Sequence, residues 1–140
     1  MTRINIVPVE ILTDKHLLAE YKEITRPFNK VISRIEKGTM NEVKIPLEYC
    51  LGIGHETFFF DKLKWLFTRY MDLFEELVRR GVNIDEDKFN SICRDLRVKL
   101  INSAYWNDYY PLPEEIYLNM ARLCRRSNVE SVTNELNSES

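Results

Sequence analysis

The stretch DKHLLAEYKEITRPFNKVISRIEKG, residues 14–38, decides the fold that we predict. Thr13 or Asp14 can cap a helix at its start, and Gly38 can end it. Pro27 lies inside the pattern and should kink the helix just above Glu23, where the freed backbone groups could open a cleft. One apolar stripe recurs at three- and four-residue spacing, and the opposite side carries polar residues. The stripe is Leu17, Leu18, Tyr21, Ile24, Phe28, Val31, Ile32 and Ile35; the polar side is His16, Glu20, Glu23, Lys30 and Arg34.

Three further segments also favour helices. Apolar periodicity predicts a second helix over residues 56–80 and a third over residues 86–99. A shorter helix should begin at Pro113, because proline suits the first helical position. Residues 39–54 contain one proline and two glycines and are predicted to be an irregular connection. Strand-like alternation is scarce, so the fold class that we predict is all-α.

The domain organisation follows from these elements. We predict a single compact domain, residues 1–126, of three main helices plus a shorter one. Residues 2–12 should form an extended N-terminal arm tucked between helices, because its Ile and Val side chains need burial. Residues 127–140 are rich in Ser, Asn and Glu and are predicted to be a disordered acidic tail.

Composition narrows the class of protein. The 140 residues are 44% hydrophobic, enough for a packed core, and contain no apolar run of about 18 residues. We therefore expect a cytoplasmic protein with no membrane partner. Cys50, Cys93 and Cys124 are odd in number and widely spaced, which favours buried reduced thiols over a disulfide framework or a metal site.

The net charge of −2 conceals an uneven distribution. The last 14 residues carry three glutamates and no Lys or Arg. A local basic face can bind phosphates even when the total charge is near zero, although solvated helix faces explain the same clusters equally well. The basic clusters are Lys22, Arg26, Lys30, Arg34 and Lys37, then Arg79 and Arg80, then Arg122, Arg125 and Arg126.

The second residue offers a candidate nucleophile. Thr2 is small, so removal of Met1 is expected to expose a free α-amino group. Such amines titrate at about pH 7.7–8.0, and the neutral form can build a Schiff base with an electrophilic carbon. A neighbouring cation such as Arg3 would disfavour the protonated amine. Glu23 could stabilise a developing positive charge nearby.

Several stretches together resemble the phage endonuclease V type of pyrimidine-dimer DNA glycosylase/AP lyase. The resemblance runs through the first 84 residues and returns, more weakly, near the C-terminus. The stretches that carry it are MTRIN at 1–5, DKHLLAEYKEITR at 14–26, LGIGHETFFFDKL at 51–63, RRGVNI at 79–84 and DYYPLPEEIYLNMARL at 108–123.

The resemblance implies an activity and a role for each matching residue. Thr2 matches the catalytic N-terminal nucleophile, and Glu23 matches the catalytic carboxylate. The partner that the resemblance implies is double-stranded DNA containing a lesion. The resemblance also implies a monomer that acts without cofactor or metal. The expected location is the cytoplasm, that of a host cell if the source is viral. Matching DNA-binding positions are Arg3, His16, Lys22, Arg26, Arg122 and Arg126, with Lys22 standing where the family has an arginine.

Lesion specificity is where the chain departs from the family. The family's aromatic and basic C-terminal segment has no counterpart after Arg126, and Tyr105, Trp106, Tyr109 and Tyr110 could substitute for it. Two alternatives therefore stay open. One is the same chemistry on a different damaged or modified base, or AP lyase activity only. The other is a non-catalytic DNA-binding module.

Other conspicuous side chains have ordinary structural interpretations. We interpret His55 as a cap of the second helix and Glu20 as a surface residue in a salt bridge. The run Phe58, Phe59 and Phe60 is predicted to lie in the core. Trp106 and its neighbouring tyrosines fit either a core or a DNA-facing patch.

Overall fold

A computed structural model describes residues 2–124 of the chain. Within that range the secondary structure is helical, without strands, which confirms the all-α prediction. The chain divides into a larger unit, Met1–Ile4 with Pro8–Tyr110, and a smaller unit, Asn5–Val7 with Pro111–Ser140. The predicted tail, residues 127–140, lies outside the described residues. No helix in the described part of the chain has the length and apolar character needed to span a bilayer.

The predicted first helix is two helices, α1 (Asp14–Glu23) and α2 (Thr25–Lys37). The Thr13 side chain caps α1 by accepting a 3.2 Å hydrogen bond from the His16 N–H. The interruption follows from Pro27, which lacks an N–H and whose ring would clash with the carbonyl four residues earlier, that of Glu23. The predicted kink is therefore a break, and it leaves Glu23 as the last residue of α1.

The predicted second helix is also interrupted. It consists of α3 (His55–Phe58), the 3₁₀ turn η3 (Phe59–Asp61) and α4 (Leu63–Arg79). At the start of α4 two backbone N–H groups turn to a distant loop: Leu63 donates to the Tyr105 carbonyl at 3.1 Å, and Trp65 to that of Asn107 at 3.3 Å. Because these donors have partners outside the helix, the chain can start a new helix there.

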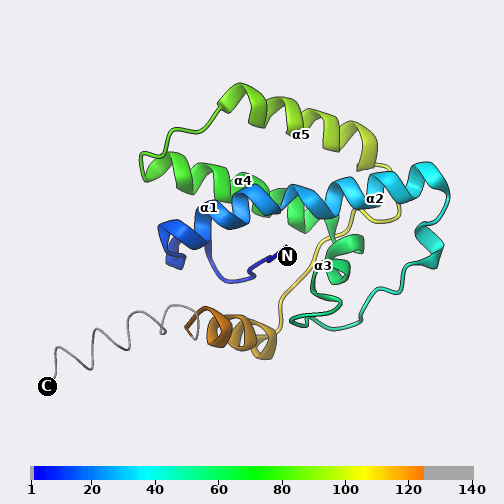
Figure 1. The fold of residues 1–140 in the computed structure, drawn as a ribbon, viewed down its shortest axis with the longest axis horizontal. Helices are drawn as coiled ribbons and strands as arrows, with labels where there is room; N and C mark the ends of the chain where they lie inside the picture. Colours follow the sequence, from blue (N-terminus) through cyan, green and yellow to red (C-terminus); the bar gives the residue numbers. More distant parts are fainter. Residues whose placement is uncertain (1, 125–140) are drawn as a thin grey trace, which may run out of the picture. The chain divides into compact units, whose positions relative to one another are not determined.

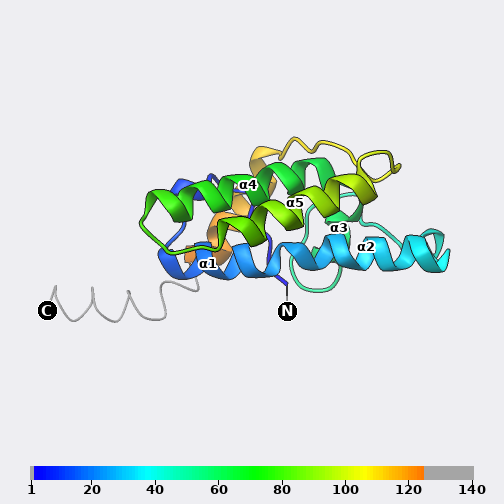
Figure 2. The same cartoon turned by 90° about the horizontal axis from the view of Figure 1, so that it is seen from above.

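The core of the larger unit lies among four of these helices. Figure 1 shows α1 and α2 following one another end to end, and Figure 2 shows α4 and α5 (Glu86–Leu100) running alongside them. Aromatic rings join the elements: Tyr21 stacks on Tyr70 with centroids 5.3 Å apart, and Phe74 stacks on Phe89 at 3.9 Å. Burial of such rings supplies much of the packing energy. The deepest side chains are Leu17, Ile24, Phe28, Leu63, Leu66, Tyr70, Leu73, Leu77 and Leu96.

An ion-pair network fastens the start of α1 to the end of α4. Arg80 donates to Asp14 at 2.8 Å and to Glu76 at 2.8 Å. It also donates to the carbonyl of Glu10 at 3.1 Å, within the 3₁₀ turn η1 (Val9–Ile11). The predicted basic cluster at Arg79 and Arg80 is thus occupied by internal pairs with Glu76. These hydrogen bonds hold the pKa of the Glu76 carboxyl down, at about 2.

The smaller unit contains a helix of residues 113–124, as predicted. The Asn119 side chain accepts a 2.7 Å hydrogen bond from the Ile6 N–H and donates to the Asn5 side chain at 2.8 Å. Arg122 donates to the same Asn5 oxygen at 2.9 Å. The prediction of buried thiols is wrong: Cys124 is exposed in the last described turn, and Cys50 and Cys93 are only half-buried.

Candidate active site

Hydrogen bonds at Ile4 hold the backbone of the N-terminal arm close to Thr2. Thr2 is buried and Ile4 is fully buried. The Ile4 N–H donates a 2.9 Å hydrogen bond to Nε2 of His55, and the Tyr49 hydroxyl donates to the Ile4 carbonyl at 3.4 Å. Both polar groups of the Ile4 backbone therefore have partners, which sets the position of Thr2 two residues earlier.

The partners of His55 define its tautomer. Nε2 accepts from an amide, so the proton must reside on Nδ1, which lies 2.8 Å from the Cys50 carbonyl and donates to it. The buried ring is thus neutral, with both nitrogens in use. The interpretation of His55 as a helix cap is wrong: Gly54 occupies the N-cap of α3, and no side chain caps that helix. The tertiary partner Ile4, far away in sequence, takes the imidazole instead.

Gly54 lets the preceding loop present His55. Its φ of +87° is a conformation that residues with a side chain rarely adopt. A Cβ there would lie only 3.1 Å from Cγ of Pro46 and 3.5 Å from Sγ of Cys50. The glycine in the motif LGIGHET therefore serves the turn that brings His55 to the arm.

Arg26 joins Thr2 to Glu23. Its Nη1 lies 3.5 Å from Oγ1 of Thr2 and 3.5 Å from Oε1 of Glu23. The two oxygens are therefore no farther apart than the sum of those distances. The Glu23 side chain is 19% exposed and that of Arg26 is 50% exposed, so the group opens to solvent. The Thr2 hydroxyl, a carboxylate and a guanidinium thus share one partly accessible place in the larger unit.

Glu20 fixes the helix that carries Glu23. Its carboxylate accepts from Nε of Arg69 at 2.7 Å and from Nη2 at 3.1 Å, and both side chains are buried. The prediction of a surface salt bridge is wrong in its location, because the pairing arginine lies on α4, against which α1 packs. This two-pronged pair orients α1 one turn before Glu23.

A sequence profile described as pyrimidine dimer DNA glycosylase matches residues 1–90. This is the part of the chain that contains Thr2, Glu23, Arg26 and His55. The chain belongs to this family. Membership in the pyrimidine dimer DNA glycosylase family makes the protein a DNA repair glycosylase, and its substrate class is DNA.

Three further predicted site residues of this glycosylase lie on or near the same elements. Arg3 follows Thr2 and is half-buried. His16 is half-buried in the first turn of α1, two turns before Glu23. Lys22 is exposed beside Glu23 and lines a cavity of about 370 Å³ whose wall includes Tyr21 and Tyr70. Among the predicted site residues that the structure describes, hydrogen bonds join Thr2 and Glu23 to Arg26.

The C-terminal candidates of the glycosylase fall in the smaller unit or outside the described residues. Arg122 is half-buried and bonded to Asn5, and Arg126 lies beyond residue 124. In the larger unit, Trp106 packs on Phe67 with centroids 5.4 Å apart, and Tyr109 packs on Trp65 at the same distance. Tyr110 is 82% exposed. Of the four aromatic residues considered for lesion contact, Tyr110 presents the most open ring.

Proposed function

We propose that this glycosylase cleaves the glycosidic bond at cyclobutane pyrimidine dimers and then nicks the resulting abasic site by β-elimination. The Thr2 amine attacks C1′ of the damaged nucleotide, and the base leaves with the glycosidic electron pair and takes up a proton. The C1′–O4′ bond then breaks: O4′ takes a proton, the nitrogen loses one, and the opened sugar is joined to Thr2 as an imine. Removal of a C2′ proton then expels the 3′ phosphate. The enzyme works as a cytoplasmic monomer in this proposal, in a host cell if the source is viral.

The contact of Arg26 with both Thr2 and Glu23 carries the proposal. A nucleophile and the group that stabilises the sugar cation must reach the same carbon from neighbouring positions. The guanidinium also disfavours a protonated amine next to it, which favours the neutral, reactive form. Its exposed half is free to approach a DNA phosphate.

Glu23 has two proposed tasks. Its carboxylate stabilises the positive charge that builds on the sugar as the base departs. After the imine forms, the C2′ proton becomes acidic, and the same carboxylate is placed to accept it. The position of Glu23 at the end of α1, with 19% of its side chain exposed, supports both tasks because substrate can reach it.

Borohydride trapping tests the nucleophile. Reduction of the imine on dimer-containing duplex should give a covalent adduct, and trypsin should release it on the peptide Thr2–Arg3. Acetylation of the N-terminus, with an unmodified sample as the control, should abolish the adduct. An adduct on any lysine, or mass spectrometry showing a mature protein that retains Met1, contradicts the proposal. Comparing dimer, abasic and modified-base duplexes separates the dimer-specific enzyme from a lyase or an enzyme for another base.

A further inference from the structure

A row of basic side chains runs from the candidate active site along α2. Arg26, Lys30, Arg34 and Lys37 follow one another at spacings of four, four and three residues; we name these four residues the α2 stripe. At about 100° per residue they fall within about a quarter of the helix circumference. The buried residues Pro27, Phe28 and Val31 lie on the adjoining face of α2. The α2 stripe is therefore a single row beside the packed face, and it begins at the arginine that contacts Thr2 and Glu23.

The far part of this row borders a cavity of about 550 Å³. Lys30, Arg34 and Lys37 line one side of it. Arg34 is steadied by a 3.3 Å hydrogen bond to the Thr39 carbonyl, so its guanidinium has a defined place on the rim. Glu42 and Glu56 also line the cavity, and the three cations outnumber them. An anion that enters meets a net positive wall.

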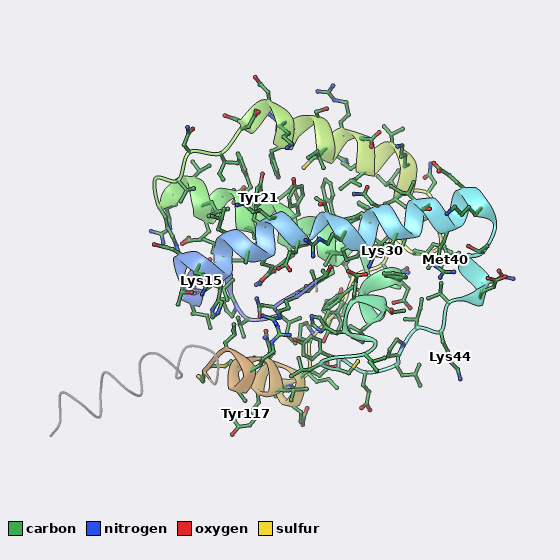
Figure 3. All side chains as sticks on the ribbon, viewed as in Figure 1. Lys15, Tyr21, Lys30, Met40, Lys44 and Tyr117 are labelled. Carbon is green, nitrogen blue, oxygen red and sulfur yellow. The ribbon has the colours of Figure 1, made fainter. Side chains whose placement is uncertain are left out.

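Lys30 has an acidic partner that lines the same cavity. It forms an ion pair with Glu56 on α3, and Figure 3 labels its side chain on α2. The Lys30 side chain is 58% exposed, whereas the Glu56 side chain is 16% exposed. The carboxylate lies beneath and the cation outside, so an incoming anion can compete for Lys30 without displacing buried structure.

We propose that the α2 stripe binds the phosphates of one DNA strand beside the lesion. The inference rests on the proposed function, because it assumes that the DNA lies at Arg26 and continues from there along α2. From Arg26 to Lys37 the helix is about 16 Å long. One strand of B-DNA carries a phosphate about every 3.4 Å along the duplex axis, so the row meets several phosphates. Glu56 limits this contact, because it competes with phosphate for Lys30.

A triple variant Lys30→Ala/Arg34→Ala/Lys37→Ala tests the binding role and leaves Arg26 in place. The control is Lys88→Ala/Arg94→Ala/Lys99→Ala, which removes three exposed cations from α5 and changes the net charge equally. Binding to undamaged duplex is measured over a series of salt concentrations. The stripe variant should bind about tenfold or more weakly, with a salt slope reduced by about one for each lost phosphate contact. The α5 variant should lose much less.

The adduct distinguishes this inference from the proposed function. At saturating DNA the stripe variant should form the borohydride-trapped adduct at the wild-type rate. Equal losses of affinity in both triple variants overturn the α2 stripe as a DNA contact, and so does slower adduct formation without weaker binding. In either case an adduct formed by the wild-type protein still supports the proposed chemistry. If the wild-type protein forms no adduct on any lesion, the proposed function fails, and the salt slopes still decide the binding role.

Two further variants guard against misfolding and test the competition. The double variant Lys30→Ala/Lys37→Ala keeps the Arg34 contact with Thr39, and should show a slope reduction of between about one and two, because Glu56 limits the Lys30 contact. Glu56→Gln should bind undamaged duplex several-fold more tightly than wild type, with a steeper salt slope, because Lys30 is released. Unchanged or weaker binding by Glu56→Gln overturns the competition between Glu56 and phosphate.

Discussion

Nε2 of His55 accepts a 2.9 Å hydrogen bond from the backbone N–H of Ile4, across 51 positions of sequence. A chain end is ordinarily free, and ordering its backbone costs about 1–2 kcal/mol for each residue. Full burial of the Ile4 side chain offsets about 1.5–3 kcal/mol of that cost. The hydrogen bond then selects one register for the buried arm. These contacts fix the place of the buried Thr2, two residues earlier, beside Arg26.

The effect of His55 on this register can be separated from its effect on packing. His55→Gln can present an amide oxygen near the place of Nε2 and should keep most of the rate of adduct formation on abasic DNA. His55→Leu leaves the Ile4 N–H buried without its acceptor and should slow the adduct by about tenfold or more. Single-turnover trapping at saturating DNA measures both, with melting temperatures as the control for stability. Equal rates in the two variants would remove His55 from the positioning of Thr2.

Replacing the side chain of Thr2 distinguishes its amine from its hydroxyl. Thr2→Ala keeps the α-amino group and loses only the 3.5 Å contact with Arg26. It should still form the trapped adduct, at a rate lowered at most about tenfold, the worth of one ordinary hydrogen bond. Thr2→Ser is the control that retains the hydroxyl. Complete loss of the adduct in Thr2→Ala, with Met1 removed, would make the hydroxyl essential.

Glu23→Gln should separate chemistry from binding. The amide is similar in size but cannot stabilise a cation by charge or accept the C2′ proton, so glycosylase turnover should fall by at least about a hundredfold. Affinity for dimer-containing duplex should stay near that of wild type, as measured by fluorescence anisotropy. Glu36→Gln, on an exposed part of α2, is the matched control. Normal turnover in Glu23→Gln would exclude this carboxylate from the mechanism.

The buried pair of Glu20 and Arg69 predicts an asymmetric response to mutation. Arg69→Leu leaves the Glu20 carboxylate buried without its partner and should lower the free energy of unfolding by about 3–5 kcal/mol. The double variant Glu20→Leu/Arg69→Leu removes both charges and should recover most of that loss. Urea unfolding followed by circular dichroism measures both. A double variant that is no more stable than Arg69→Leu would show that the pair's hydrogen bonds, and not the unpaired charge, dominate.

Glu76 predicts a loss of stability in acid. Its hydrogen bonds with Arg79 and Arg80 hold its pKa at about 2 in the folded protein, below the ordinary value of 4.5. The unfolded chain therefore takes up this proton first, so the stabilisation is complete above about pH 4.5 and is lost as the pH falls towards 2. Unfolding midpoints of wild type and Glu76→Gln should converge over that window. Glu75→Gln, exposed on the same helix, is the control; a constant difference would contradict the assignment.

The sequence by itself determined the helices and the family of this protein. Helix starts, ends and breaks depend on residues within a few positions, so the Thr13 cap, the Gly38 end and the interruption at Pro27 could be inferred from local spacing. The motifs likewise pointed to Thr2, Glu23 and Arg26, because residue type and order are written in the chain itself.

Only the tertiary structure decided what lies beside these residues. Glu20 looked like a surface residue because its partner Arg69 is 49 positions away, and His55 looked like a cap because nothing local shows that its ring meets Ile4. The start of α4 similarly depends on carbonyls from the loop around Tyr105. Local periodicity reports which side of a helix is apolar, whereas a buried polar group is stabilised by whichever distant donor or acceptor the packed chain brings to it.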